Sequence, residues 1–321
     1  MNRVSDRRQF MLRAAVAGSV AMAATSTVSF GRLVAAQSAT PAATPEAPVS
    51  VAPDLPTITV TANDGVYSIS TPSGGLMEGD VVIELVNATA NNIANVNFVM
   101  LPEDVSVGDF TSLLSTAFKG EGGTLPDWFA TDKAVFAGGV FAAPGHSAQT
   151  IVTLSAGKWV AFSSNPGSNQ SAQVISVSAP EPAEDTGTPE ATPVAEASPV
   201  VVSRPSDNTI TLAAGSITFE SDPTTSQAIW KVTNTSTEVM EVVLVKEVDT
   251  AIDPAAIAAA VASGDTVNGL VVAGSGALSP NVSAYIGGTL EAGNYAAFSS
   301  LPAAGGGLQS AAGAATSITV A

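Results

Sequence analysis

Two segments of this 321-residue chain decide its architecture, because they repeat each other. Residues 154–164 read LSAGKWVAFSS, and residues 290–300 read LEAGNYAAFSS. Each has a glycine, then an aromatic residue, then a run of small and apolar residues, a pattern typical of a buried β-strand that follows a turn. The chain therefore contains two copies of one folding unit, separated at this point by 136 residues.

A second match lies earlier in each copy, at a wider spacing. Residues 81–87 (VVIELVN) align with 228–234 (AIWKVTN), and 96–100 align with 243–247, an offset of 147. The first copy therefore carries 11 extra residues, which lie within 119–136. Because this insert distinguishes the copies, it is where we expect a specific function.

One helix is expected between the middle strands of each copy. Asp109 begins it in the first copy, and Asp253 followed by Pro254 begins it in the second, with Gly264 as a stop signal. The rest of each copy consists of short strands separated by Gly, Pro and Asn turns, which indicates a Greek-key β-sandwich. Abundant Val, Ile and Thr agree with a mostly β fold.

The amino terminus carries an export signal. Residues 5–12 (SDRRQFML) resemble the twin-arginine translocation motif, and a weakly apolar stretch over 14–28 follows. The small residues Val34-Ala35-Ala36 predict cleavage after Ala36. A general secretory signal and an uncleaved anchor remain the alternatives. The chain is accordingly expected outside the cytoplasm, in the periplasm, at the cell surface or secreted, with no transmembrane span after cleavage.

Two linkers divide the remainder. Residues 37–54 are rich in Ala, Thr and Pro, and residues 179–206 add acidic residues to the same composition, which predicts extended tethers. The predicted domains are therefore residues 55–178 and 207–321, after the signal peptide at 1–36.

Charge and cysteine usage exclude several functions. Removing residues 1–36 leaves six basic residues against 27 acidic ones, a net charge of −21. Nucleic-acid binding needs Lys and Arg to neutralise phosphates, so it is excluded. The chain has no cysteine, which excludes thiolate catalysis, iron–sulfur clusters, zinc–thiolate sites and thiolate-ligated copper.

Both copies resemble the cupredoxin family of blue-copper domains. In the first copy, Gly79-Asp80-Val81 leads to Asn87 as in the family's strand before the first copper histidine. The later matches resemble the turn and strand that approach the copper thiolate: Pro144, Gly145, Leu154, Gly157 and Trp159 in the first copy, and Pro280, Leu290, Gly293 and Tyr295 in the second. The resemblance implies two tandem cupredoxin-like Greek-key sandwiches.

The ligands of that family are missing. Its Cys-x-x-Pro-x-His loop corresponds to residues 163–168 (SSNPGS), with Ser163 at the cysteine and Ser168 at the histidine, and the earlier histidine falls near Ala94. In the second copy, Ser299 and Ala304 take the two loop positions. Thiolate and imidazole donors define a blue-copper site, so no cofactor is predicted.

Few other residues are candidates for a site. His146 is the single histidine, and the Pro-Gly-His-Ser sequence indicates a turn; copper capture by His146 with Met100 is a weak alternative. On the insert, Trp128 with Asp127 and Phe129 is a candidate contact for a protein or glycan partner, the alternative being that Trp128 and Phe129 cap the sandwich.

These observations predict a non-catalytic binding or structural protein of the cell envelope, with an unidentified protein or glycan partner. The alternative is a copper or redox accessory protein with non-standard ligands. A third hypothesis is a glycosidase built on two facing carboxylates.

Overall fold

The protein is described from a computed structural model. It describes residues 52–63, 66–89, 93–117, 126–130, 133–163, 172–180, 204–247, 270–303 and 308–321. The predicted signal peptide, most of both linkers, the ligand loop after Ser163 and the helix expected from Asp253 lie outside these residues.

The first copy is built from strands β1 to β9 and two helices. Its elements are β1 (Thr57–Asn63), β2 (Val66–Ser70), β3 (Leu76–Met77), β4 (Gly79–Asn87), β5 (Ala94–Met100), α2 (Val107–Ala117), α3 (Asp127–Ala130), β6 (Val135–Ala142), β7 (Ser147–Leu154), β8 (Gly157–Phe162) and β9 (Gln173–Ser178). The short helix α3 lies in the insert and was not predicted.

The second copy repeats this order of strands. Its elements are β10 (Asn208–Ala213), β11 (Ser216–Phe219), β12 (Ile229–Asn234), β13 (Met240–Lys246), β14 (Leu270–Leu278), β15 (Ser283–Gly287), β16 (Gly293–Phe298) and β17 (Ala315–Val320). The prediction of a mostly β fold built from two sheets is confirmed.

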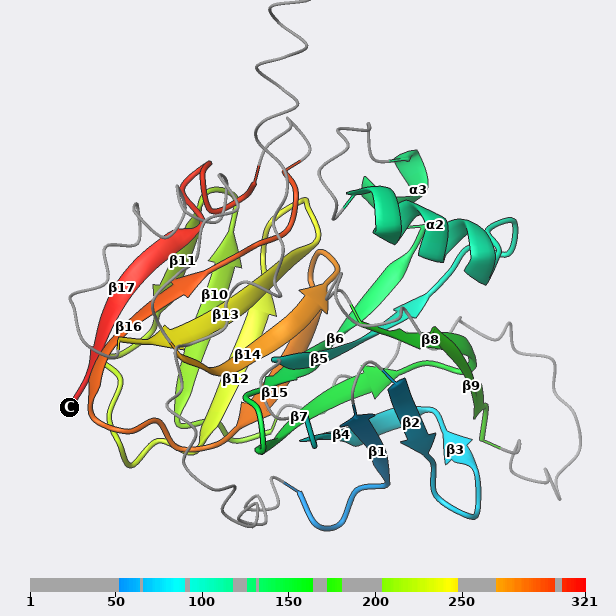
Figure 1. The fold of residues 1–321 in the computed structure, drawn as a ribbon, viewed down its shortest axis with the longest axis horizontal. Helices are drawn as coiled ribbons and strands as arrows, with labels where there is room; N and C mark the ends of the chain where they lie inside the picture. The colour runs from blue at the N-terminus through cyan, green and yellow to red at the C-terminus, as the bar shows by residue number, and fades with distance from the viewer. Residues whose placement is uncertain are drawn as a thin grey trace, which may run out of the picture.

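The two sandwiches share their sheets (Figure 1). One sheet has the order β11-β10-β12-β15-β7-β4-β1-β2, and the other has the order β17-β16-β13-β14-β6-β5-β8-β9-β3. Each sheet therefore runs without interruption from one copy into the other. A single apolar cluster between the sheets includes residues of both copies, among them Ile83 and Phe98 from the first and Trp230 and Leu244 from the second.

The copies join through counterpart strands. β6 pairs with β14 and β7 pairs with β15, both antiparallel. In the repeat, β14 corresponds to β6 and β15 to β7, so each strand meets its own equivalent, as at a two-fold interface. This seam of paired strands gives one chain the arrangement of a symmetric dimer.

Glycines allow the strands at the seam to approach closely. A Cβ on Gly139 would lie 1.9 Å from the Val96 carbonyl oxygen, and one on Gly276 would lie 2.1 Å from Asn97 Oδ1. The freed space is used by Asn97, whose Oδ1 accepts a hydrogen bond from the Ala277 amide at 2.9 Å. A side chain of the first copy thus satisfies the backbone of the second.

Conserved contacts inside each copy confirm the repeat and correct its register. Asn87 Nδ2 donates to the Ala142 carbonyl, and Asn234 Nδ2 donates to that of Leu278, the equivalent residue. However, Asn97 pairs with Phe162 in β5–β8, and Val243 pairs with Phe298 in β13–β16. Because the late offset is 136, Val243 is the counterpart of Asn97. The predicted alignment of 96–100 with 243–247 is therefore wrong by one residue, and the turn before β13 is the shorter one.

The helix of the first copy begins before its predicted start. Asp109 was predicted as the N-cap, but α2 starts at Val107 and Ser106 caps it. The Asp109 amide donates to Ser106 Oγ at 3.1 Å, and Ser106 Oγ donates to the Asp109 carboxylate at 2.6 Å. Ser106 is therefore the N-cap residue, and Asp109, the third residue of the helix, is held to its side chain by both hydrogen bonds. No helix in the described part of the chain is long and apolar enough to cross a membrane.

Candidate functional site: the Ser163 and Ser299 ends and the insert

In the first copy, the position expected for the copper thiolate is part of a buried hydrogen-bond network. Ser163, 1% exposed, follows β8 and donates from Oγ to Asn95 Oδ1 at 2.9 Å. Tyr67 on β2 donates from its hydroxyl to Ser163 Oγ at 3.2 Å. Three strands thus converge on one serine. The network joins the edge of one sheet to the centre of the other, which is a packing role.

In the second copy, Asn95 is replaced by Glu241. Its side chain is 1% exposed, and its carboxylate accepts hydrogen bonds from both the amide and the hydroxyl of Ser300. Burial raises the pKa of Glu241 from 4.5 to about 7, and the Ser300 hydrogen bonds only partly oppose this rise. Sequence analysis missed Glu241 because the predicted alignment was wrong by one residue and did not place it beside Ser299 and Ser300.

A second bond network holds the same end of the second copy. Ser299, the counterpart of Ser163, donates to Gln309 Oε1 at 2.6 Å. Gln309 Nε2 in turn donates to the Val239 carbonyl at 2.8 Å. Glu238 lies at the rim of this network, with Oε2 3.5 Å from Gln309 Nε2. Ser300 and Gln309 are therefore both tied to the start of β13.

These residues do not fit a copper centre of the cupredoxin type. Hydroxyl and amide oxygens occupy positions where thiolate and imidazole would be needed, and Ala94 and Met240 stand at the equivalent places on β5 and β13. Among the described residues, no group of three or more His, Cys, Asp or Glu side chains is arranged to hold a metal ion.

The proposed pair of His146 and Met100 does not come together. His146 is exposed and lies in the turn between β6 and β7, where its carbonyl accepts a hydrogen bond from the Asn87 amide. In β5–β6, Ala94 pairs with Ala142 near that turn, whereas Met100 pairs with Val135 at the opposite end. The length of β5 therefore separates the two side chains, roughly 20 Å for seven residues.

The insert places its aromatic residues against the sandwich. Phe129 is 6% exposed and packs edge-on against Phe136, with ring centroids 5.2 Å apart. Trp128 is half-buried and lies 6.2 Å from the Phe110 ring on α2, while Asp127 is exposed. Phe129 thus belongs to the core, and Trp128 and Asp127 reach the surface of this end.

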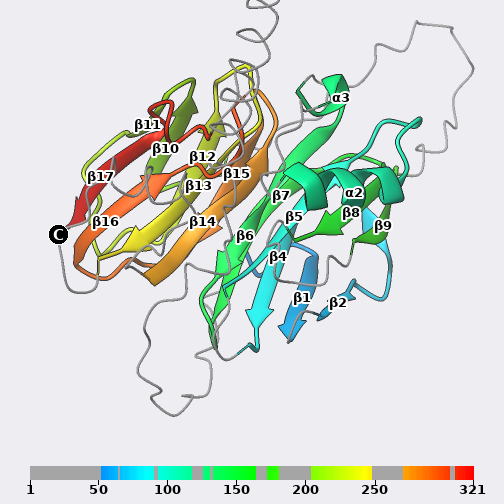
Figure 2. The same ribbon diagram turned by 45° about the horizontal axis from the view of Figure 1, so that its top comes forward.

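The insert contacts the end of the second copy that contains Glu241 and Ser300. A separate apolar cluster joins Phe110, Phe129 and Phe162 of the first copy to Val239 and Leu301 of the second. Leu301 directly follows Ser300, the partner of Glu241, and Val239 precedes β13. Figure 2 shows α3 beyond the upper end of the first copy's strands and α2 lying across β5 and β8. The region in which the copies differ is therefore continuous with the one that holds the buried carboxyl group.

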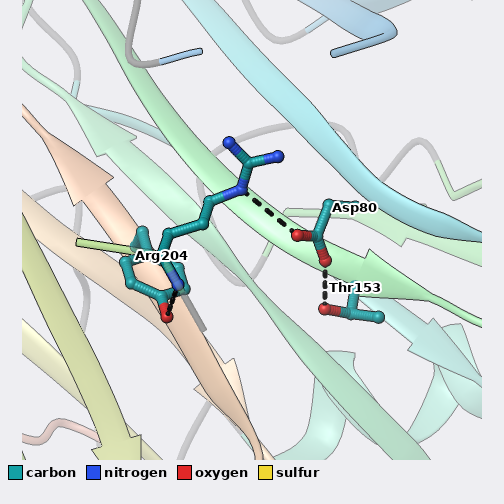
Figure 3. A network of polar contacts seen from close by, with 4 residues as sticks. Asp80, Thr153 and Arg204 are labelled. Atoms are coloured by element: carbon teal, nitrogen blue, oxygen red, sulfur yellow. Dashed lines mark hydrogen bonds and ion pairs between the residues drawn. The ribbon is translucent and has the colours of Figure 1, made fainter. Parts of the chain in front are cut away.

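A polar network on the other side of the seam anchors the linker between copies. Arg204 Nε lies 3.3 Å from Asp80 Oδ2, and Thr153 Oγ1 donates to the second carboxylate oxygen at 2.7 Å (Figure 3). The Arg204 amide donates to the Tyr285 hydroxyl at 3.0 Å. Arg204 therefore binds β4 of the first copy and β15 of the second, and its role is to fix the chain at the crossover.

No protein-family model matches the chain, and no curated protein matches it. Among solved structures, it is similar to dithionite-reduced auracyanin from Roseiflexus castenholzii (23% identity, 36% of this chain, 99% of that chain, TM-score 0.26). It is also similar to a multi-copper oxidase from Pediococcus acidilactici (10% identity, 83% of this chain, 58% of that chain, TM-score 0.21). A copper-containing nitrite reductase from Thermus scotoductus SA-01 is a third example (13% identity, 83% and 61%, TM-score 0.22). No inference about ligands or activity follows from likeness of this degree.

Proposed function

We propose that this protein is an exported, non-catalytic binding or structural protein of the cell envelope, built from two cupredoxin-like sandwiches that have exchanged their metal ligands for internal hydrogen bonds. The observation that supports it is the engagement of Ser163 with Asn95 and of Ser299 with Gln309, at 2.9 and 2.6 Å. Side chains used in this way hold the fold together instead of a ligand.

The proposed contact surface is the end formed by the insert. Trp128 and Asp127 lie at its surface, and Trp128 is backed by the rings of Phe110 and Phe129. A tryptophan supported by other rings presents a rigid apolar face with a polar N–H, which suits a sugar ring or a partner's apolar side chain. The continuous sheets would hold this end rigidly.

Catalysis by acidic residues is less well supported. Glu241 is the one described carboxyl group with a raised pKa, as a glycosidase acid requires. Its burial, at 1% exposure, keeps it out of reach of a polysaccharide in this conformation.

The test begins with the metal content of the mature protein, residues 37–321, purified without chelator after export in its own cell. We expect copper well below 0.1 equivalent per chain by elemental analysis. About one equivalent of copper that survives dialysis would overturn the proposal and support the copper accessory protein instead.

Binding is tested separately with arrayed envelope glycans and with purified envelope proteins. We expect Trp128→Ala to lose the binding that the unmodified protein shows. Val66→Ala serves as the matched control, because Val66 is 62% exposed on β2 at the outer edge of the first copy. Equal loss in both variants, or no loss in either, would contradict a contact through the insert.

A further inference from the structure

The exposed large apolar side chains of the described residues all lie at one end of the molecule. They are Val66 on β2, Met77 on β3 and Val174 on β9, which are 62%, 47% and 54% exposed. β2 and β3 are the terminal strands of the two sheets on the first copy's side, and β9 pairs with β3. Figure 1 shows these three strands on the side of the first copy away from the second. Together they form the outer edge of the first copy.

The equivalent strands of the second copy carry serine where the first copy carries exposed valine. By the registers of the equivalent strand pairs, Ser216 on β11 takes the place of Val66, and Ser317 on β17 takes the place of Val174. Strands of this kind therefore form and pair without an apolar side chain at either position. The concentration of exposed apolar residues at one edge alone indicates a contact surface and not a requirement of the fold.

The outer edge is also poor in charge, although the protein is strongly acidic. Residues 37–321 contain six basic and 27 acidic side chains. The exposed positions of β2 and β9 are uncharged throughout: Val66, Ser68, Ser70, Val174, Ser176 and Ser178. Two acidic molecules repel each other, so they can approach only through surfaces that lack acidic side chains. The outer edge therefore suits a partner of the same charge, whereas a basic partner would be attracted to the acidic surfaces.

The seam shows how this fold joins one sandwich to another. There β7 pairs with β15 and β6 pairs with β14, so both sheets continue across and each strand meets its equivalent. β15 does this with five residues, and β2 is also five residues long. β2 contains neither lysine nor proline, the residues by which edge strands commonly prevent pairing. A two-fold contact between two outer edges would repeat the arrangement of the seam.

We propose that the outer edge binds the outer edge of a second copy of this chain, through antiparallel pairing of β2 with β2 of the other molecule. The pairing extends one sheet across both molecules and covers Val66 and Val174. A dimer carries two insert ends, which increases the affinity for a partner that repeats along an envelope polymer. This last consequence rests on the proposed function, whereas the dimer itself does not.

The dimer is tested by sedimentation equilibrium of residues 37–321 between about 1 and 200 μM, the range in which weak symmetric contacts are populated. We expect dimerisation that depends on concentration. Val174→Asp and Ser317→Asp place the same charge at the same position of the two copies. Val174→Asp should weaken the dimer about 30-fold or more, because an unpaired carboxylate would be buried. Ser317→Asp is the matched control and should dimerise as the unmodified protein does.

Hydrogen–deuterium exchange distinguishes pairing of β2 from a looser contact. Backbone amides of residues 66–70 should exchange more slowly in the dimer than in the monomer, whereas those of β11 should exchange equally in both. Val66→Asp should abolish the difference. Because Val66 and Val174 are exposed, both variants should fold, and Val66→Ser, which installs the second copy's residue, is a milder variant expected to weaken the dimer about fivefold.

Three results would overturn the proposal: a monomer over the whole range, a dimer that tolerates both Val66→Asp and Val174→Asp, or equal weakening by Ser317→Asp. Trp128→Ala should leave the dimer unchanged, since Trp128 lies on α3, outside the outer edge. Val66→Ala, the control for partner binding, adds no charge and keeps the edge strand, so most of the dimer should remain. The dimer and the contact through the insert therefore fail independently.

Discussion

The two copies bury polar side chains with different chemistry at the same end of the fold, beside Ser163 in the first copy and beside Ser299 and Ser300 in the second. In the first copy, Tyr67, Ser163 and Asn95 form a neutral network. In the second, Ser300 meets Glu241, and Ser299 meets Gln309. Both ends are buried and hydrogen-bonded, yet only the second contains a group that titrates near neutral pH. The scaffold therefore accommodates different buried side chains there when their main polar atoms are hydrogen-bonded.

The largest loss of stability is expected at the seam, where strands of the two copies pair with each other. Gly276→Val should lower the free energy of unfolding by about 4 kcal/mol, because its Cβ would lie 2.1 Å from Asn97 Oδ1 and 2.9 Å from the Gly139 backbone, both in the first copy. Denaturant unfolding measures the change. Gly74→Ala is the control, since its Cβ meets nothing within 4 Å. Equal stabilities for the two variants would show that the strands are not in this register.

Glu241 should make stability depend on pH in the second copy. Its raised pKa contributes stability that is fully present below pH 4.5 and is lost as pH rises to about 7. The loss amounts to about 3 kcal/mol by proton linkage. Subtracting the unfolding profile of Glu241→Gln from that of the unmodified protein isolates this contribution. A difference that grows in the opposite direction, or none at all, would place Glu241 in a solvated or cation-paired setting.

The ion pair at the linker should be worth more than the ion pair within the second copy. Asp80 is 9% exposed and also accepts from Thr153, so a double-mutant cycle of Arg204→Ala and Asp80→Asn should give a coupling of about 1.5 kcal/mol. Lys246 and Glu291 provide the comparison. The Glu291 side chain is 85% exposed, so the same cycle there should give a few tenths of a kcal/mol. Equal couplings would mean that Arg204 is not held at the crossover.

A single-residue comparison distinguishes Ser163 in the first copy from Ser300 in the second. Ser163→Ala should cost about 1 kcal/mol at any pH between 5 and 8, because it removes one buried hydroxyl from a neutral network. Ser300→Ala should cost a similar amount at pH 5 and more at pH 8, where the Glu241 carboxylate loses a donor. Thermal unfolding of both variants at both pH values is sufficient. Parallel behaviour would contradict the assigned difference between the copies.

The repeat could be predicted from the sequence because the matching residues lie within single short segments of the chain. The segments 154–164 and 290–300 have glycine, aromatic and serine residues at the same spacing. In the structure they form the equivalent strands β8 and β16. Trp159 donates to the Ser155 carbonyl, and Tyr295 donates to that of Glu291, four residues earlier in each case. Contacts over such short distances along the chain are set by local pattern, and pattern also predicted the mostly β fold.

The sequence by itself determined that the chain is mostly β, that it contains two copies of one unit and that the first copy carries an insert. Only the tertiary structure decided that the copies share two continuous sheets, that Arg204 closes the linker onto both, and that Glu241 lies beside Ser300 and next to the insert. The physical reason is the range of the interactions. Strand pairing across the seam and the burial of one carboxyl group depend on residues dozens to more than a hundred positions apart. A one-residue change in a turn shifts every such contact without altering the local pattern.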